Sequence, residues 1–367
     1  MDAAAVWHQS GGAALTAPGV PTPTRLVRTV AGLVGWLDRC GAGLTLEFAA
    51  GGAGLLTARA AMLGLPRSGQ ASCGGATRLL QAADGWVAVT LARPDDWAAL
   101  PAWLGCDPSA LGQSTPEGWE LVERLVARRD AAEVVAAAVV LGMAAAVVGE
   151  VRSADLTRMQ RVGEAPPRPL RGLRVANLAA LWAGPLAADL LHRLGADVIC
   201  VESVARPDGS RATPPWFDSL HAGQRFASFD LRTDAGVEGL VTMLSEVDVV
   251  IEGSRPRALE QLGIDAEAIT RGGPRVWASI TGHGRRQPNA MRVAFGDDAA
   301  AAGGLVGWRP GGPVFLADAV ADPLAGLVTA ATIVELIERG GRWLVDVALA
   351  AVAAAAADRP DSSAPTG

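Results

Sequence analysis

The sequence contains no lysine and no tyrosine, and aromatic residues make up only 5% of it. All 32 basic residues are arginines, which are interspersed with 38 acidic residues to give a formal net charge of −6. Nucleic-acid binding is typically marked by a basic stripe with interleaved aromatic side chains, and the sequence shows no such stripe. We therefore expect no nucleic-acid partner.

Cysteine is also scarce, and its spacing argues against two kinds of site. The four cysteines lie far apart and form no Cys-x-x-Cys pair; they are Cys40, Cys73, Cys106 and Cys200. This pattern supports neither a zinc site nor a disulfide framework, and scattered thiols are typical of a reducing cytosol. We expect a cytoplasmic protein that binds no metal.

Long hydrophobic runs are absent as well. The most membrane-like stretch, Val134 to Gly149, is mostly alanine and valine and falls short of the ~20 strongly apolar residues that a membrane span needs. We interpret it as a buried or interfacial helix. The segment Met1 to Ser10 has neither a basic region nor an apolar core, so it is not expected to be a signal peptide. These features predict a soluble protein without a membrane span.

The chain divides at a proline-rich segment. Pro166, Pro167 and Pro169 lie among arginines, and proline restricts both itself and the residue before it to extended conformations. Residues 166–174 are therefore predicted to be an extended linker between an N-terminal and a C-terminal part. The tail, residues 351–367, is rich in alanine and then polar, and it is predicted to be disordered.

The C-terminal part, residues 175–350, alternates short apolar runs with helical patterns. Such alternation implies right-handed crossovers and a parallel sheet covered by helices on both faces. We therefore predict a Rossmann-like α/β domain. Its expected strands are Val175–Leu181, Val198–Val201, Arg225–Leu231, Val247–Ile251 and Val276–Thr281, and its expected helices are Pro185–Leu194, Gly236–Leu244 and one around Leu259.

The N-terminal part has a different pattern. Asp84-Gly85, a dipeptide that favours a tight hairpin turn, separates two apolar runs between Arg78 and Leu91. Pro94 begins a predicted helix, and helical patterns dominate from Trp119 to Val148. We predict a smaller α+β domain over residues 61–165.

Residues 1–60 echo the C-terminal end of the chain. Ala31-Gly32-Leu33-Val34 matches Ala325-Gly326-Leu327-Val328, and a preceding pattern of glycine pairs and prolines recurs at the same spacing. Each copy continues as an amphipathic helix and then an alternating strand, Leu44–Phe48 or Leu344–Leu349. Chance similarity is the alternative in so alanine-rich a sequence, but we interpret residues 1–60 as a βα unit that packs with the Rossmann-like domain.

Asp322 is the most informative candidate for chemistry. It precedes Pro323, and apolar residues then recur at helical spacing as far as Arg339, which predicts that Asp322 is the N-cap of a helix. In one interpretation it only caps the helix, as aspartate commonly does. In the other, the helix N-terminus keeps the carboxylate ionised and available as a nucleophile at neutral pH.

Glycine pairs lie just upstream of Asp322. The backbone N–H groups of Gly303-Gly304 and Gly311-Gly312 could approach a developing oxyanion without a side chain in the way. In the N-terminal copy of the echo, Arg28 stands at the position of Asp322. Only the C-terminal copy is therefore expected to be active.

Several motifs of the C-terminal part occur in one order that is similar to a known superfamily. They are Pro169-Leu170-Arg171-Gly172-Leu173-Arg174-Val175, Ala183-Gly184-Pro185, Leu194-Gly195-Ala196-Asp197-Val198-Ile199 with Glu202, Phe229-Asp230-Leu231, Asp248-Val249-Val250-Ile251-Glu252, Leu262-Gly263, Ser279-Ile280-Thr281-Gly282 and Asp322-Pro323-Leu324-Ala325-Gly326. Each motif is weak alone, but their shared order is specific. Through them the chain resembles the class III coenzyme A transferase and α-methylacyl-CoA racemase superfamily (CaiB/BaiF-like).

The N-terminal part resembles a later segment of the same superfamily. The matching motifs are Arg78-Leu79-Leu80, Asp84-Gly85-Trp86-Val87-Ala88-Val89 and Asp96-Trp97. The superfamily usually places its nucleotide-binding half first, so the order of the segments is swapped here. The chain resembles a circular permutant or a piece of a doubled ancestor.

The resemblance implies a Rossmann-like domain, a smaller domain and an interlocked homodimer. Coenzyme A would lie along the parallel sheet near its C-terminal edge. The aspartate that matches Asp322 would attack an acyl-CoA thioester, form an aspartyl anhydride and then an aspartyl-CoA thioester, and pass CoA to a carboxylic acid. The implied partners are thus an acyl-CoA and a carboxylic acid.

The resemblance also implies residues that contact CoA. Leu181, Trp182 and Ala183 match the loop after the first strand, although this pattern is equally that of a simple strand-to-helix turn. Arg255 matches an arginine after the fourth strand, where pairing with a phosphate is expected.

Some positions depart from the superfamily's pattern. Gln224 stands where a basic residue is common, a loss that Arg225 or Arg206 could compensate. Gly253 replaces the usual asparagine after Glu252. These changes leave open a degenerate subunit that binds CoA or a partner chain without turnover.

Racemases of the superfamily pair the aspartate with a histidine, and the matching stretch Ala294-Phe295-Gly296-Asp297-Asp298 contains none. His283 is the nearest histidine in sequence, and a loop histidine is more often solvated than catalytic. We therefore rank CoA transfer above racemisation, which needs an acid and a base on opposite sides of the α-carbon.

Asp297 and Asp298 are interpreted as solvated or helix-capping residues rather than a metal site. Because no Gly-x-Gly-x-x-Gly follows the first strand, an NAD-dependent dehydrogenase is disfavoured.

Overall fold

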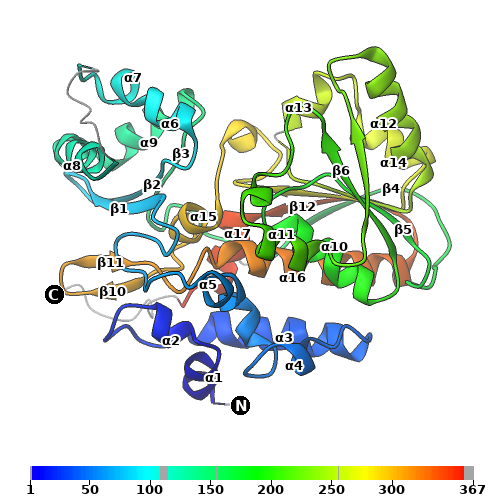
Figure 1. Ribbon diagram of the computed structural model, residues 1–367, viewed down its shortest axis with the longest axis horizontal. Coiled ribbons are helices and arrows are strands. Elements are labelled where there is room, and N and C mark those ends of the chain that lie inside the picture. The colour runs from blue at the N-terminus through cyan, green and yellow to red at the C-terminus, as the bar shows by residue number, and fades with distance from the viewer. Residues whose placement is uncertain (1, 108–114, 154, 255, 359–367) are drawn as a thin grey trace.

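The computed structural model describes residues 2–107, 115–153, 155–254 and 256–358. Figure 1 shows a large twisted sheet with helices against both faces, a smaller unit beside it, and the N-terminal helices packed beneath. The smaller unit and the large sheet come from the two parts of the chain that the proline-rich segment separates.

The large sheet has seven strands in the order β4-β12-β9-β8-β5-β6-β7, and every neighbouring pair except β4 with β12 is parallel. The chain therefore starts its parallel strands at β5 and extends the sheet outward from it in both directions. This order places a topological switch point between β5 and β8, where such sheets bind ligands beyond the carboxyl ends of the strands. The strands are β4 (Arg158–Gly163), β5 (Arg174–Asn177), β6 (Asp197–Ser203), β7 (Arg225–Phe229), β8 (Val249–Glu252), β9 (Val276–Thr281) and β12 (Arg342–Ala348).

Both faces of this sheet are covered, which confirms the predicted α/β fold. Successive strand residues point to opposite faces, so Val249 packs into one core and Val250 into another. Helix α16 is buried on nearly all sides because it lies among the sheet, α3, α10 and α17. The first core contains α10 (Ala183–Arg193), α16 (Ala321–Arg339) and α17 (Leu349–Ala356), and the second contains α12 (Asp234–Glu246) and α14 (Ala266–Gly272).

Shorter elements connect these layers. A small antiparallel hairpin, β10 with β11, precedes α16. The remaining elements of this part are η3 (Gly209–Ala212), α11 (Pro214–His221), α13 (Pro256–Glu260), η4 (Asn289–Met291), α15 (Gly296–Ala302), β10 (Gly307–Arg309) and β11 (Gly312–Val314).

The smaller unit is a three-stranded antiparallel sheet with helices on it. The hairpin predicted at Asp84-Gly85 is confirmed, because β1 and β2 pair on either side of it. The unit is tied to the large domain by the Thr90 hydroxyl, which lies 2.8 Å from a carboxylate oxygen of Asp298 on α15. Its elements are β1 (Thr77–Gln81), β2 (Trp86–Thr90), α6 (Pro94–Ala98), α7 (Leu100–Leu104), α8 (Thr115–Val126), α9 (Ala131–Val140) and β3 (Ala144–Val147).

The N-terminal segment is helical, so the strand predicted over Leu44–Phe48 is wrong. The Asp38 carboxylate accepts the backbone N–H groups of Leu44 (2.6 Å) and Thr45 (2.9 Å) and so caps a short helix there. The echo with the C-terminal end is limited to the long helices α3 and α16, which pack together. The elements are α1 (Ala3–Gln9), α2 (Gly12–Leu15), α3 (Thr24–Arg39), α4 (Leu44–Glu47), η1 (Ala53–Thr57) and α5 (Ala58–Leu63).

Three further expectations need correction. The apolar stretch Val134–Gly149 is not one helix, since α9 ends at Val140 and the chain turns at Gly142, which has a φ of +70°, into β3. Strand β4 was not predicted, and it joins the large sheet although it falls within the range predicted for the smaller domain, 61–165. The predicted disordered tail begins in α17, which is ordered to Ala356; residues 359–367 lie outside the described part of the chain.

Candidate active site

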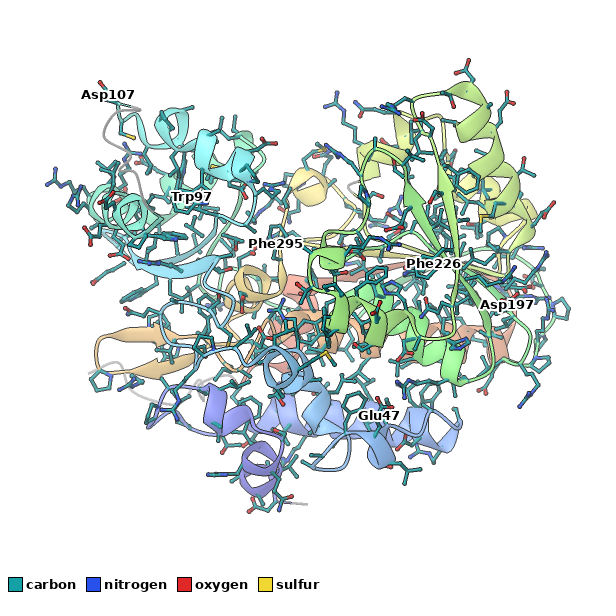
Figure 2. All side chains as sticks on the ribbon, in the orientation of Figure 1. Glu47, Trp97, Asp107, Asp197, Phe226 and Phe295 are labelled. Carbon is teal, nitrogen blue, oxygen red and sulfur yellow. The ribbon has the colours of Figure 1, made fainter. Side chains whose placement is uncertain are left out.

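A pocket of about 330 Å³ opens where the parallel strands end. Its walls come from the loops that follow β5, β8 and β9, so it lies at the topological switch point of the sheet. Phe295, labelled in Figure 2 between the smaller unit and the large sheet, also lines it. Asp322 reaches the same pocket from the first turn of α16. The fold therefore brings the main candidate residue to the place where this architecture binds ligands.

Asp322 is not the N-cap of its helix. Helix α16 begins at Ala321 with Val320 at the N-cap, and the backbone N–H of Asp322 donates to the Ala319 carbonyl at 2.9 Å. The side chain makes no capping hydrogen bond within the described part of the chain. It stays in the first turn, where the positive end of the helix dipole still acts on it. Asp322 is thus free for another role.

Behind Asp322 lies a cluster of buried charges. Asp318 is fully buried and forms a two-bond ion pair with Arg59, with N···O distances of 2.5 and 2.9 Å. A carboxylate oxygen of Asp297 accepts the backbone N–H of Ala319 at 3.0 Å. Arg59 also lies over the ring of Trp182, 5.0 Å from its centroid, and Trp182 lines the pocket. One guanidinium therefore stands among several carboxyl groups at the base of the pocket.

This environment controls the charge of Asp322. Burial raises the pKa of Asp322 to about 7, Arg59 opposes the rise, and the neighbouring carboxyl groups of Asp297, Asp298 and Asp318 add to it. The expectation that the helix N-terminus keeps this carboxylate fully ionised at neutral pH is therefore wrong. Near pH 7 the group is divided between the acid and the carboxylate, so small changes in its surroundings change how much nucleophile is present.

Asp297 and Asp298 are both buried, so the expectation of solvation is wrong, although Asp298 does cap a helix. A carboxylate oxygen of Asp298 accepts the N–H of Phe295, the residue before α15, at 2.9 Å. Burial raises the pKa of each of these two carboxyl groups to about 7. Both are therefore largely protonated in mildly acidic solution.

The glycine that lies against the nucleophile candidate is Gly296. A Cβ at this position would be 2.6 Å from an Asp322 carboxylate oxygen and 2.6 Å from the Ala319 carbonyl oxygen. Any side chain there must displace either the carboxylate or the backbone before α16. We interpret Gly296 as the residue that leaves room for the Asp322 carboxylate.

Replacing Gly296 with alanine is expected to destabilise the fold by ~1–3 kcal/mol, the usual range for overpacking a core, and to lower any activity that depends on Asp322. Urea unfolding and a transfer assay measure the two effects. Gly32→Ala on the exposed side of α3 is the matched control, since a Cβ there meets nothing within 4 Å. Alanine at position 32 should stabilise by up to ~1 kcal/mol. Unchanged stability and activity in Gly296→Ala would contradict this interpretation.

The glycines predicted to support an oxyanion, Gly303 and Gly304, do not line the pocket. A Cβ at Gly303 would be 2.5 Å from the Ala354 nitrogen and 2.7 Å from the Ala350 oxygen, because the end of α15 packs closely on α17. Gly304 has a φ of +74° in the turn that follows. Packing and turn geometry account for both glycines, so the predicted catalytic role is not retained.

The predicted CoA loop lies where the resemblance implied. Leu181, Trp182 and Ala183 all line the pocket after β5. Leu181 has a φ of +71°, and its N–H donates to both carboxylate oxygens of Asp208 at 3.1 Å, which fixes this turn. Trp182 packs edge-on against Trp216 with the ring centroids 5.0 Å apart. The loop is therefore a rigid wall of the pocket.

The arginines that were predicted to contact CoA do not all lie at the pocket. Arg206 lines both the 330 Å³ pocket and a neighbouring one of about 160 Å³ at the ends of β5, β6 and β7. Arg225 begins β7 at the opposite end of the strand and forms an exposed ion pair with Asp197. The expectation that Arg225 contacts CoA phosphates is therefore wrong. Arg255 lies outside the described residues.

His283 does not share the pocket of Asp322. It lines a separate pocket of about 320 Å³, and burial, with a further effect of Arg292, lowers the pKa of His283 to about 3. Its imidazole is therefore neutral at physiological pH. The structure does not bring together the acid and base that racemisation through Asp322 and His283 would require.

Three arginines of the site were not singled out from the sequence: Arg93 and Arg292, which line the pocket, and Arg59, which lies behind it. Arg59 and Arg93 come from segments far from Asp322 in the chain, and none of the three belongs to a local motif. Only the tertiary fold brings them near Asp322, so local sequence patterns carried no signal for them.

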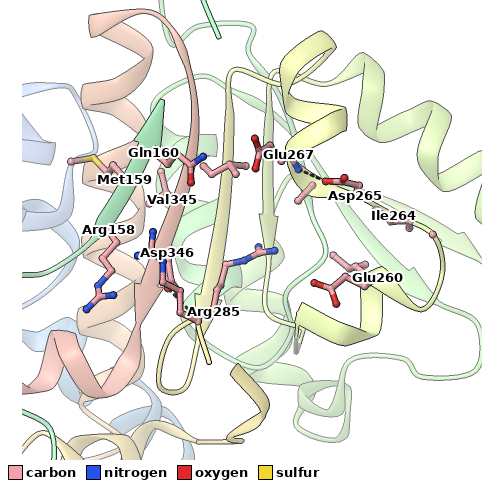
Figure 3. A pocket seen from close by; sticks show the side chains of 15 residues that line it. Arg158, Met159, Gln160, Glu260, Ile264, Asp265, Glu267, Arg285, Val345 and Asp346 are labelled. Carbon is pink, nitrogen blue, oxygen red and sulfur yellow. Dashed lines mark hydrogen bonds between the residues drawn. The ribbon is translucent and has the colours of Figure 1, made fainter. Parts of the chain in front are cut away.

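A larger pocket, of about 540 Å³, lies near the β4 edge of the sheet, against β4, β12 and α14 (Figure 3). Two of its charged residues, Asp346 and Arg285, are held by hydrogen bonds and an ion pair. Asp346 accepts the Thr281 hydroxyl and the Arg285 backbone N–H, each at 2.9 Å, and the Arg285 guanidinium pairs with Glu252 at 3.1 Å. Asp322 and the loop predicted to hold CoA line the 330 Å³ pocket instead, so the larger pocket is not the candidate active site.

Two features, a group of metal ligands and a membrane-spanning helix, are absent from residues 2–107, 115–153, 155–254 and 256–358. No group of three or more His, Cys, Asp or Glu side chains there is arranged to hold a metal ion. None of the helices in those ranges is long and apolar enough to cross a membrane.

Comparison with known proteins relates this site to a family. A sequence profile described as CoA-transferase family III matches residues 170–359. Succinyl-CoA–D-citramalate CoA-transferase of Chloroflexus aurantiacus is 30% identical over 177 residues, 45% of this chain and 44% of that protein. Succinate–glutarate CoA-transferase of Agrobacterium fabrum is 32% identical over 203 residues, 49% of this chain and 51% of that protein.

A solved structure of a CAIB/BAIF family protein from Brucella suis is 31% identical, with a TM-score of 0.45, and the match covers 52% of this chain and 55% of that one. The chain spans about half the length of the curated relatives it matches.

Proposed function

The chain belongs to CoA-transferase family III, and from this premise we propose that it transfers coenzyme A from an acyl-CoA thioester to a carboxylic acid through a covalent intermediate on Asp322. One observation supports this function most strongly. A half-buried carboxyl group lines the pocket at the switch point of the sheet, beside the loop predicted to hold CoA. The same group has a pKa of about 7, so it is available as a carboxylate at neutral pH.

The proposed reaction proceeds in balanced steps. A carboxylate oxygen of Asp322 attacks the thioester carbonyl, the C–S bond breaks, and the CoA thiolate leaves an aspartyl anhydride. The thiolate then attacks the Asp322 carbonyl, which releases the donor carboxylate and leaves an aspartyl-CoA thioester. The incoming carboxylate repeats both steps in reverse and departs as the new acyl-CoA, and the Asp322 carboxylate is regenerated. Water takes no part in these steps.

We place the bound CoA across two adjoining pockets. The 330 Å³ and 160 Å³ pockets share Ala179, Ala180, Arg206 and Ser254. The nucleotide would occupy the smaller pocket, whose walls are partly apolar, and the pantetheine arm would run through the larger one to Asp322. Arg206, which lines both, is the residue placed to meet the phosphates.

The proposal includes the cytoplasmic location expected from the scattered cysteines and the interlocked homodimer that the resemblance implies. For the described residues, both parts of one chain contribute to the wall of the pocket, since Arg93 belongs to the N-terminal part and Asp322 to the C-terminal part. We therefore expect one chain to supply both the nucleophile and the smaller unit of its site.

A transfer assay tests the proposed function. Incubation with succinyl-CoA and isotope-labelled glutarate should yield labelled glutaryl-CoA, without net loss of thioester to water. A CoA ester at 100 times its dissociation constant should also add about 2.7 kcal/mol to the stability of the fold. Exchange of the α-proton of an acyl-CoA with deuterated water, without transfer, would indicate a racemase instead. Thermal protection without either reaction would indicate a CoA-binding subunit that has lost turnover.

A further inference from the structure

The charges that line the 330 Å³ pocket are unequal. Among the described residues that line it, the charged side chains are Arg93, Arg206, Arg292 and Asp322. Arg206 also lines the smaller pocket, where the nucleotide of CoA is proposed to lie. Arg93 and Arg292 therefore remain as cations beside Asp322 that the proposed binding of CoA does not use. Each is paired with a carboxylate that does not line the pocket, so what the two guanidinium groups offer a ligand is N–H donors.

Arg93 is held in place along one edge of its guanidinium. Its Nε lies 3.1 Å from both carboxylate oxygens of Asp96, and its Nη2 donates to Asp96 (2.5 Å) and to the Gly142 carbonyl (2.9 Å). The remaining nitrogen, Nη1, has no acceptor among the described residues. Asp96 is buried and does not line the pocket. Arg93 is thus oriented from behind, with donor groups to spare.

Arg292 is held in a similar way from the side of the smaller unit. Its Nη2 donates to Glu150 (2.5 Å) and to the carbonyl of Ala145 in β3 (3.1 Å). Its Nε is buried without a hydrogen-bond partner in the described part of the chain. Because this Nε has no exposed surface, the donor left for a ligand is Nη1, which has no acceptor among the described residues. Glu150, like Asp96, does not line the pocket.

A carboxylate is the ligand that suits two guanidinium groups, because it accepts paired N–H bonds. The wall beside the two arginines includes Val293, Ala294 and Phe295, which suit a short methylene chain. The other carboxylate of the same molecule would react at Asp322, the carboxyl group that lines the pocket.

We propose that Arg93 and Arg292 form a subsite for the second carboxylate of a short dicarboxylic acid, which is the acid that exchanges CoA in this pocket. The inference rests on the proposed function. It assigns the choice of acid to the smaller unit, because the partners that orient both arginines, Asp96, Gly142, Ala145 and Glu150, lie outside the region that matches the family profile.

Steady-state kinetics with matched acids test this subsite. Succinate and butyrate have the same chain length, and only succinate carries the second carboxylate. With succinyl-CoA as donor, kcat/KM should be roughly 10- to 100-fold higher for succinate than for butyrate, the scale of a charge-assisted hydrogen bond. Isotope-labelled succinate makes the symmetric exchange visible.

Variants assign the preference to the two arginines. Arg93→Gln and Arg292→Gln should each raise KM for succinate by roughly 10-fold or more while KM for butyrate changes little. Arg124→Gln, on an exposed face of α8 in the smaller unit, is the matched control and should change neither constant. Circular dichroism checks folding. Because Arg93→Gln leaves the buried Asp96 unpaired, the double variant Arg93→Gln/Asp96→Asn is measured beside it.

The outcomes separate the subsite from the reaction. Equal kcat/KM for the two acids, or variants that weaken both acids alike, would overturn the subsite and leave CoA transfer standing. Absence of transfer to either acid would overturn the proposed function, and the subsite with it.

Discussion

Asp322→Asn is expected to lower the rate of CoA transfer by roughly 10³-fold or more, the scale seen when an enzyme loses its nucleophile. The amide has the shape of the carboxylate but cannot form the anhydride. Transfer of labelled acid into acyl-CoA measures the effect. Asp218→Asn, on the exposed surface of α11, should retain full activity as a control. Transfer at the wild-type rate by Asp322→Asn would remove this residue from the mechanism.

The same variant should also change how stability depends on pH. Because the pKa of Asp322 rises from 3.8 to about 7 on folding, its contribution to stability is fully present below pH ~4 and is lost as pH rises toward 7. The asparagine variant lacks this loss. The free energy of unfolding of Asp322→Asn, minus that of wild type, should therefore be larger at pH 8 than at pH 4. Urea unfolding at the two values measures the difference, and an equal difference at both would contradict the raised pKa.

Arg59→Gln is expected to have the largest effect on stability. It leaves Asp318, which is fully buried, without its ion-pair partner. Removing one partner of a buried pair typically costs ~3–5 kcal/mol. The double variant Arg59→Gln/Asp318→Asn should recover much of this loss, because no charge is then left unpaired. Equilibrium unfolding in urea measures both, with Arg28→Gln on the exposed face of α3 as the control.

Arg59 should also act on the reaction through Asp322. Its charge lowers the pKa of Asp322, so its removal raises that pKa and less carboxylate is present at neutral pH. The rate of transfer should therefore rise with pH through a midpoint near 7 in wild type and through a higher midpoint in Arg59→Gln. A purely structural role would lower the rate at every pH and leave the midpoint unchanged. That result would contradict a role for Arg59 in setting the charge of Asp322.

Local patterns were sufficient for most elements of the Rossmann-like domain. Its strands are apolar runs between helical segments, and β9 occupies the predicted range, Val276–Thr281. The order of the strands in the sheet follows from the crossover rule once the elements are known. Sequence reasoning failed at Leu44–Glu47, where the alternating pattern predicted a strand. The segment is helical because the Asp38 carboxylate, six and seven residues earlier, caps it, a local signal that the prediction did not use.

The sequence placed Asp322 at the start of a helix, which is correct to within the first turn, but its charge state could not be predicted. The prediction relied on the helix N-terminus, whose effect on a charge is ~0.3–1 kcal/mol. Burial and the neighbouring carboxyl groups are larger effects, because they raise the pKa from 3.8 to about 7. Those neighbours depend on tertiary structure: Arg59 and its partner Asp318 are 259 residues apart in the chain.

The smaller unit has more influence on the site than its sequence indicated. Arg93 reaches the pocket from it, and Arg292 is held by its residues Ala145 and Glu150. Both parts of the chain, on either side of the proline-rich segment, therefore contribute to one pocket. The motifs of the C-terminal part indicate the chemistry, and the proposed carboxylate subsite depends on residues of the smaller unit.

Trapping of the intermediate tests the central claim most directly. The protein is incubated with an acyl-CoA and hydroxylamine, digested, and analysed by mass spectrometry. An activated acyl group on the nucleophile should appear as a hydroxamate on the peptide that contains Asp322, and the Asp322→Asn variant should yield none. A hydroxamate on a different residue, or transfer that continues with no trapped product, would contradict a covalent mechanism at Asp322.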